Sequence, residues 1–142
     1  MKRTVTLVDL YEDQSTFDQK IKFLYHALSD RRPEQYISFR MPTKQEHWEF
    51  VISRPYEAWY MVKALGWIGS IYLTRQNEIG IFLETAYQRD GYGRAAVNAL
   101  MERHGDRRYL ANINPANTSS IRFFEDMGFR RVQYTYAWEG KK

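Results

Sequence analysis

The chain has 142 residues, which is the length of one domain over residues 1–142. Of these residues, 44% are hydrophobic and 16% aromatic, a composition that indicates a globular fold instead of a disordered chain. It has no cysteine, which excludes disulfides and thiolate chemistry, and its three histidines are widely separated, so no metal site is expected. The net charge of +4, from 21 basic and 17 acidic residues, suits an anionic ligand.

The beginning of the chain shows no targeting signal. Met1-Lys2-Arg3 is followed over residues 4–10 by strand-like alternation instead of an unbroken apolar run, and no stretch approaches the ~18 apolar residues of a membrane span. The basic residues are spread along the chain, apart from Lys141-Lys142, which disfavours nucleic-acid binding. We therefore expect a cytoplasmic protein with neither a membrane nor a nucleic acid as its partner.

Two helices are predicted after the first strand. Residues 16–19, Thr-Phe-Asp-Gln, have the spacing of a capping box and open a helix that ends near Asp30, before Pro33. Residues 43–46, Thr-Lys-Gln-Glu, repeat this spacing and open a second helix, which Pro55 bounds. The predicted apolar face of the second helix consists of Trp48, Val51 and Ile52.

From Ala58 the pattern changes to a period of two residues, which is typical of strands. Three successive antiparallel strands are predicted, and a helix that ends at His104-Gly105 follows them. The chain then continues with a short strand, a helix capped by Asn117 and a last strand. The predicted strands of this half span residues 58–62, 67–74, 78–83, 109–113 and 131–138.

The strand at 78–83 leads through a polar turn into Gln88-x-x-Gly91-x-Gly93 and then into a helix. A helix N-terminus preceded by glycines is an anion site, because its first N–H groups lack internal partners and the helix dipole is positive there. Arg89 and Arg94 flank this turn and add positive charge. The dinucleotide fingerprint does not fit, since Ala96 stands in place of its third glycine, and a Walker lysine is absent.

Residues 88–93, Gln-Arg-Asp-Gly-Tyr-Gly, resemble the pyrophosphate-binding motif of the GNAT superfamily of acyl-CoA-dependent N-acetyltransferases. Residues 117–129, NTSSIRFFEDMGF, are similar to a second signature of that family, Asn-x-x-Ala/Ser-Ile-x-Leu-Tyr-x-x-x-Gly-Phe. The order of predicted elements also matches up to the last strand, so the resemblance covers nearly the whole chain. It implies an α/β fold, with a mixed, mostly antiparallel twisted sheet of six or seven strands flanked by about four helices. The seventh strand is missing, very short or supplied by a partner subunit.

The resemblance implies acetyl-CoA as the cofactor and transfer of its acetyl group by direct attack of an amine. In the family, the fourth and fifth strands splay apart, the pantetheine arm enters the gap, and a backbone N–H near Leu83 would polarise the thioester carbonyl. The residues that the resemblance places at acetyl-CoA are Ile81, Phe82, Leu83, Gln88, Arg89, Asp90, Gly91, Tyr92, Gly93, Arg94, Asn112, Asn117, Ser120 and Phe124.

Two positions depart from the family pattern. The tyrosine that commonly protonates the CoA sulfur falls at Phe124, and a glutamate that some members use as a base falls at Asn112; neither side chain titrates. Glu78 and Glu84, at the two ends of a predicted strand, are the candidate bases. For the acid, Tyr87, Tyr134 and Tyr136 are the alternatives, or the thiolate leaves directly to water.

Residues 39–50 and 77–81 resemble the GNAT subgroup that acetylates amino groups of nucleotide-activated amino sugars. The expected acceptor is therefore a small primary amine, best an amino sugar or a nucleotide-linked amino sugar. The alternatives are a protein or peptide amine, or a CoA-binding module without catalysis; either a monomer or a homodimer is expected. Tyr36, Ser38, Arg40, His47 and Trp59 are candidates for acceptor binding, although an exposed helix position is favoured for His47.

Overall fold

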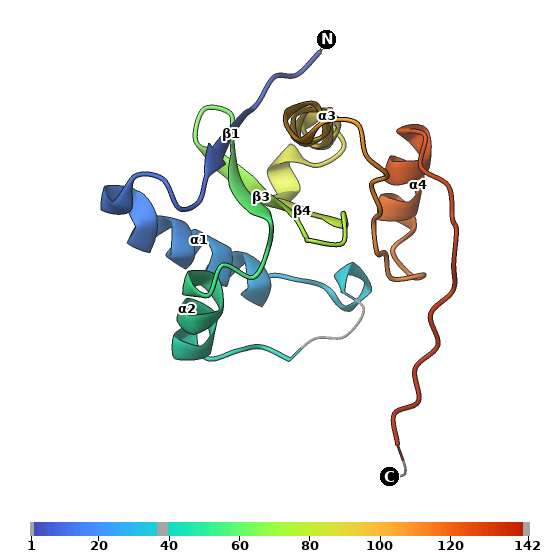
Figure 1. Ribbon diagram of the computed structural model, residues 1–142, viewed down its shortest axis with the longest axis horizontal. Coiled ribbons are helices and arrows are strands. Elements are labelled where there is room, and N and C mark those ends of the chain that lie inside the picture. Colours follow the sequence, from blue (N-terminus) through green and yellow to red (C-terminus); the bar gives the residue numbers. More distant parts are fainter. Residues whose placement is uncertain (1, 37–39, 141–142) are drawn as a thin grey trace.

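A computed structural model describes residues 2–36 and 40–140 of the chain (Figure 1). Its centre is a four-stranded antiparallel sheet in which each strand pairs with the next in sequence. The strands are β1 (Thr6–Asp9), β2 (Ala58–Lys63), β3 (Trp67–Leu73) and β4 (Ile79–Leu83). The predicted α/β fold class is confirmed.

Helices cover both faces of this sheet (Figure 1). Successive residues of a strand point to opposite faces, so Trp59 and Met61 pack against α1 and α2, whereas Tyr60 and Val62 pack on the side of α3. The helices are α1 (Phe17–Ser29), α2 (Lys44–Ile52), α3 (Tyr92–His104) and α4 (Thr118–Asp126). The described residues also form the short 3₁₀ turns η1 (Gln14–Thr16), η2 (Pro33–Gln35) and η3 (Thr85–Tyr87). No helix in the described part of the chain is long and apolar enough to cross a membrane.

The two predicted capping boxes have different outcomes. At α2 the prediction is confirmed, because Thr43 Oγ1 accepts from the N–H of Glu46 and the Glu46 carboxylate accepts from the N–H of Thr43. At α1 it is wrong, because Thr16 makes no side-chain cap. Asp13 instead accepts from the N–H of Ser15 and opens η1, which starts the helical path one turn earlier.

The predicted strand count of six or seven is wrong, because the described residues contain four strands. Residues 109–113 contribute only an isolated parallel bridge, between Glu78 and Leu110. Residues 131–138 form no strand, and Tyr136 and Trp138 are 91% and 83% exposed. Strand structure requires a hydrogen-bonded neighbour, and these segments find none along most of their length, so alternation alone overpredicted them.

The buried face of α2 also differs from its prediction. Val51 is buried as expected, but Ile52 is 49% exposed and its place toward the core is taken by His47, which is only 4% exposed. The expectation that His47 is an exposed helix residue is therefore wrong. Its position one turn before Val51 puts both on the same helical face. Ser38, one of the predicted acceptor residues, lies outside the described residues.

Candidate functional site

The backbone groups of β4 alternate between two neighbours. Glu84, just past the strand, donates its N–H to Ile68 O at 2.9 Å, so the even-numbered residues face β3. Ile79 donates in the opposite direction, to Leu110 O at 2.7 Å, and Leu110 N–H returns to Asn77 O at 2.9 Å. The backbone groups of the odd-numbered residues therefore face residues 110–113.

Beyond Leu110 this second edge opens. No backbone hydrogen bond among residues 2–36 and 40–140 joins Ile81 or Leu83 to residues 111–113. Leu83 O accepts from Gln88 Nε2 at 2.8 Å, which leaves the N–H of Leu83 and both backbone groups of Ile81 facing the gap. This edge can bind a chain that carries amide groups, and the Leu83 N–H can polarise a carbonyl placed in the gap.

The N-terminus of α3 follows this edge closely along the chain. Gly91 is its N-cap with φ 90° and Arg89 has φ 60°, so two left-handed residues turn the chain sharply before the helix. Gly91 has no side chain to cap the helix, and the first-turn N–H groups of Tyr92, Gly93 and Arg94 have no intrahelical acceptor. Together with the helix dipole, these groups make an anion site.

The charged side chains around this N-terminus are held by distant parts of the chain. Arg3 pairs with Asp90, Nη2 to Oδ2 at 2.8 Å, and lies 5.0 Å from the centre of the Tyr92 ring. Arg94 donates to Asp126 O at 3.2 Å. The pairing of Arg3 neutralises the Asp90 carboxylate, which would otherwise repel an anion here. Sequence reasoning missed Arg3, because no local pattern connects it with Asp90.

The second signature stretch forms α4. Asn117 Oδ1 accepts from Ser120 N–H at 3.1 Å and caps the helix, as predicted. Arg89 Nη2 reaches Ser119 Oγ at 3.5 Å, which brings the two signature stretches together. Phe124 is 5% exposed and packs edge to face against Phe123 and Phe129, so the residue at the family's tyrosine position is a core residue here.

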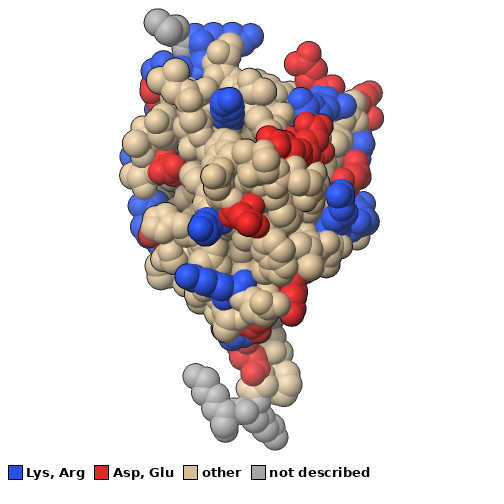
Figure 2. All heavy atoms as spheres, turned by 90° about the vertical axis from the view of Figure 1, so that its left-hand side faces the viewer, with Lys and Arg blue, Asp and Glu red and all other residues tan. Residues whose placement is uncertain are grey.

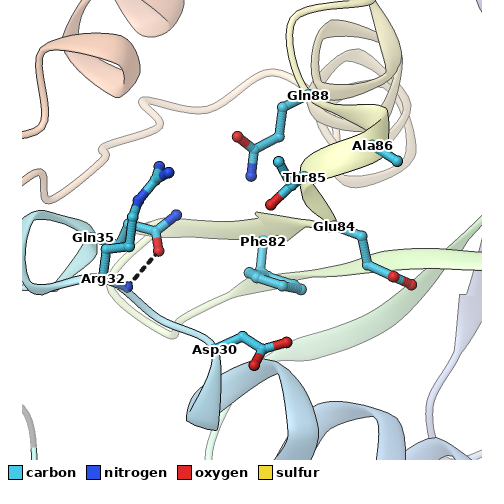
Figure 3. Close-up of a pocket in the computed structure, with 8 residues that line it drawn as sticks. All are labelled: Asp30, Arg32, Gln35, Phe82, Glu84, Thr85, Ala86 and Gln88. Carbon is cyan, nitrogen blue, oxygen red and sulfur yellow. Dashed lines mark hydrogen bonds between the residues drawn. The ribbon is translucent and has the colours of Figure 1, made fainter.

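Two hollows lie next to β4, and Phe82 lines both. The first, here called the polar hollow, has a volume of about 260 Å³. In Figure 3, Arg32 and Gln88 extend toward each other above the Phe82 ring, and Asp30 lies below it. Its lining residues are Asp30, Arg32, Gln35, Phe82, Glu84, Thr85, Ala86 and Gln88.

The second, here called the aromatic hollow, has a volume of about 570 Å³ and lies among α1, α2 and the sheet. The predicted acceptor residues Arg40, His47 and Trp59 line it. Tyr36 does not; its carbonyl accepts from Asn114 Nδ2 at 2.6 Å. Aromatic side chains that sequence reasoning missed complete the wall: Phe50, Tyr56 and Tyr72.

The rings of this wall are packed on one another. Tyr56 and Tyr72 stack with centroids 3.9 Å apart and planes at 5°, and Trp59 meets Tyr56 edge to face at 4.9 Å. Gly80 lies opposite Tyr72 in the sheet, and a Cβ there would overlap the tyrosine ring. Burial raises the pKa of Tyr56 and lowers that of His47, so both side chains are neutral at pH 7.

The two predicted bases lie in different surroundings. Both oxygens of the Glu78 carboxylate are occupied, one by Thr74 Oγ1 at 3.0 Å and the other by Asn112 Nδ2, and Glu78 lines neither hollow. Glu84 is exposed and lines the polar hollow. Of the predicted acids, Tyr134 and Tyr136 are 67% and 91% exposed, and none of the three tyrosines lines the polar hollow or the aromatic hollow. In the part of the chain that the structure describes, no cluster of side chains could hold a metal ion.

Comparison with known protein families decides the assignment. The model of the acetyltransferase (GNAT) domain matches residues 6–130. The chain belongs to the GNAT acetyltransferase family. It is therefore an N-acetyltransferase that uses acetyl-CoA, and the family assignment predicted from residues 88–93 and 117–129 is confirmed. Comparison with curated proteins finds no match.

Solved structures of GNAT acetyltransferases share the fold at low sequence identity. An acetyltransferase from Thermus thermophilus has a TM-score of 0.69 and 17% identity, covering 92% of this chain and 90% of its own. The yncA protein of Salmonella typhimurium, solved with its cofactor acetyl-CoA, gives 0.62 and 17%, covering 89% and 80%. AAC(6')-Iy in complex with the bisubstrate analogue CoA-S-monomethyl-acetylneamine gives 0.66 and 14%, covering 99% and 100%.

Proposed function

We propose that this enzyme acetylates a primary amine of a small acceptor, with an amino sugar as the first candidate, and that the acceptor binds in the aromatic hollow. The observation that carries the proposal is the position of this hollow, whose lining includes Gly80, Ile81 and Phe82 of β4. Its flat rings suit the apolar face of a sugar. The amine-bearing ligand of AAC(6')-Iy, an acetylneamine analogue joined to CoA, supports the same acceptor class.

Acetyl-CoA would enter at the edge of β4 that faces away from β3, in the gap beside residues 110–113. The pantetheine amides pair with the open backbone groups of Ile81, and the pyrophosphate binds the N-terminus of α3 between Arg89 and Arg94. The remaining contacts carried over from the family are made by Asn112, Asn117 and Ser120. The Leu83 N–H then receives the oxyanion that forms when the amine attacks the thioester carbonyl. Because the attack is direct, positioning of the two substrates supplies much of the rate enhancement.

We place the general base at Glu84. Its carboxylate is exposed to the polar hollow, which shares the Phe82 wall with the aromatic hollow, so water can carry the amine proton to it. The Glu78 carboxylate holds Asn112 beside β4 and thereby positions residues 110–113. The CoA thiolate takes its proton from solvent, because Phe124 has no hydroxyl and none of the candidate tyrosines lines either hollow.

The test is CoA release from acetyl-CoA against free amino sugars, nucleotide-linked amino sugars, polyamines and basic peptides, with mass detection of the product. We expect acetylation of an amino-sugar amine; transfer only to peptides would refute the proposed acceptor. Glu84→Gln should lower kcat about a hundredfold and abolish the acidic limb of the kcat profile. Glu78→Gln is the matched control, and a larger loss of kcat in it than in Glu84→Gln would reverse the assignment of the base.

A further inference from the structure

The charges of the residues that line the aromatic hollow do not sum to zero. They are Arg31, Arg40 and Glu46, so the lining carries one excess positive charge. Glu46 is already engaged: one oxygen pairs with Arg40 at 3.2 Å and the other accepts from Thr43 N–H at 2.8 Å. Within residues 2–36 and 40–140, no carboxylate lies within ion-pair distance of Arg31.

Arg31 stands at the end of α1, where neighbouring residues face different hollows. Asp30 lines the polar hollow, together with Glu84, whereas Arg31 lines the aromatic one. The positive charge of Arg31 also acts on the Tyr56 hydroxyl, where it partly offsets the rise in pKa that burial causes. Arg31 and the stacked rings of Tyr56 and Tyr72 thus line the same hollow.

The same wall contains polar atoms that lack partners. Among the described residues, Trp59 and His47 are both more than nine-tenths buried. Nε1 of Trp59 and Nδ1 of His47 are nevertheless without a hydrogen-bond partner. An indole N–H can only donate, and leaving such a group unpaired costs about 1–3 kcal/mol. Both atoms have almost no exposed surface, so only an oxygen that enters between the rings of the wall could supply the missing acceptor.

We propose that the acceptor amine carries an anionic group, a carboxylate or a phosphate, that Arg31 binds in the aromatic hollow. This inference rests on the proposed function, since it describes the acceptor of the same site. An anionic group meets the guanidinium in a charge-assisted hydrogen bond, whereas a polyamine or a basic peptide would bring more positive charge to a positive lining. The amine of the bound acceptor then points toward Phe82, which lines both hollows. Asp30 and Glu84, which line the polar hollow, place negative charge on that side of Phe82.

The test is calorimetric binding of two probe pairs to protein saturated with CoA, which has no acetyl group to transfer. The pairs are glucosamine 6-phosphate with glucosamine, and 4-(aminomethyl)benzoate with 4-(aminomethyl)benzamide. In at least one pair the anionic member should bind about tenfold more tightly than its neutral partner. Arg31→Gln should reduce this preference to about threefold or less, with no loss of cooperative thermal unfolding. Arg108→Gln, which removes one exposed charge from outside both hollows, should keep it.

A preference that is absent from both pairs, or that is unchanged in Arg31→Gln, overturns the inference. So does a loss of preference in Arg108→Gln equal to that in Arg31→Gln, because net charge would then explain it. Titration of the same protein preparation with acetyl-CoA distinguishes a failure of this inference from a failure of the proposed function. If acetyl-CoA binds but neither anionic probe is preferred, only this inference fails; if acetyl-CoA does not bind, the proposed function fails as well.

Discussion

The substitution Gly80→Ala probes how the aromatic wall is built on the sheet. In the register of β3 and β4, Gly80 lies opposite Tyr72, and the missing side chain leaves the space that the tyrosine ring occupies. A Cβ there would overlap the ring, so Tyr72 would have to move away from Tyr56, on which it stacks at 3.9 Å. The wall of the aromatic hollow would change with it.

The expected cost follows from the contacts that are lost. Breaking the ring stack costs about 0.5–1.5 kcal/mol, and forcing an extra methyl into a packed site costs about 1–3 kcal/mol, so we expect a destabilisation of about 2 kcal/mol. For a chain of this size the unfolding midpoint should fall by about 6 °C.

Thermal unfolding followed by circular dichroism measures this effect. The matched control is Gly66→Ala, since a Cβ on Gly66 meets nothing within 4 Å. The control should change the midpoint by about 1 °C at most. Equal midpoints for the two variants would refute the close approach of Tyr72 to β4.

Three further substitutions test other parts of the structure. Thr43→Ala removes the α2 cap and should cost about 1 kcal/mol in denaturant unfolding, whereas Thr16→Ala, which removes no helix cap, should cost less; equal losses would contradict the cap assignment. Burial lowers the pKa of His47 below its ordinary 6.5, so the unfolded chain binds the proton more readily, and stability is present above that pH and lost below it. His47→Gln should therefore reduce the fall in unfolding free energy between about pH 7 and pH 5; an undiminished fall in His47→Gln would refute this. Arg89→Ala should weaken acetyl-CoA binding about tenfold by calorimetry, and Arg108→Ala should not; equal affinities would remove Arg89 from the anion site.

Local patterns in the sequence predicted the strand, turn and helix at residues 78–104 because every determinant lies nearby in the chain. The glycines, the polar turn and the apolar helix face can be read together, and the structure places β4, Gly91 and α3 accordingly. The second capping box is predictable for the same reason. The prediction of a cap at Thr16 was wrong because Asp13, three residues earlier, caps the turn that leads into the same helix.

Features that depend on pairing across the fold could not be predicted. The segments at 109–113 and 131–138 alternate like strands, but whether they form strands depends on a neighbour's backbone. The Arg3–Asp90 pair and the Tyr72–Gly80 contact join positions that only the folded sheet brings together. Charge could not be predicted in detail either. Basic and acidic residues are interspersed on the face in Figure 2, and net charge does not reveal that no carboxylate of residues 2–36 and 40–140 lies within ion-pair distance of Arg31.

The most direct test of the account is the change in backbone amide NMR signals when acetyl-CoA is added. The β4 amides alternate in direction, so Ile81 and Leu83 should shift strongly, together with Tyr92 and Gly93 at the start of α3, whereas Phe82, whose N–H faces β3, should shift much less. Saturable shifts with this alternation would support binding in the gap beside β4. Equal shifts along β4, or shifts that leave both β4 and the start of α3 unchanged, would contradict it.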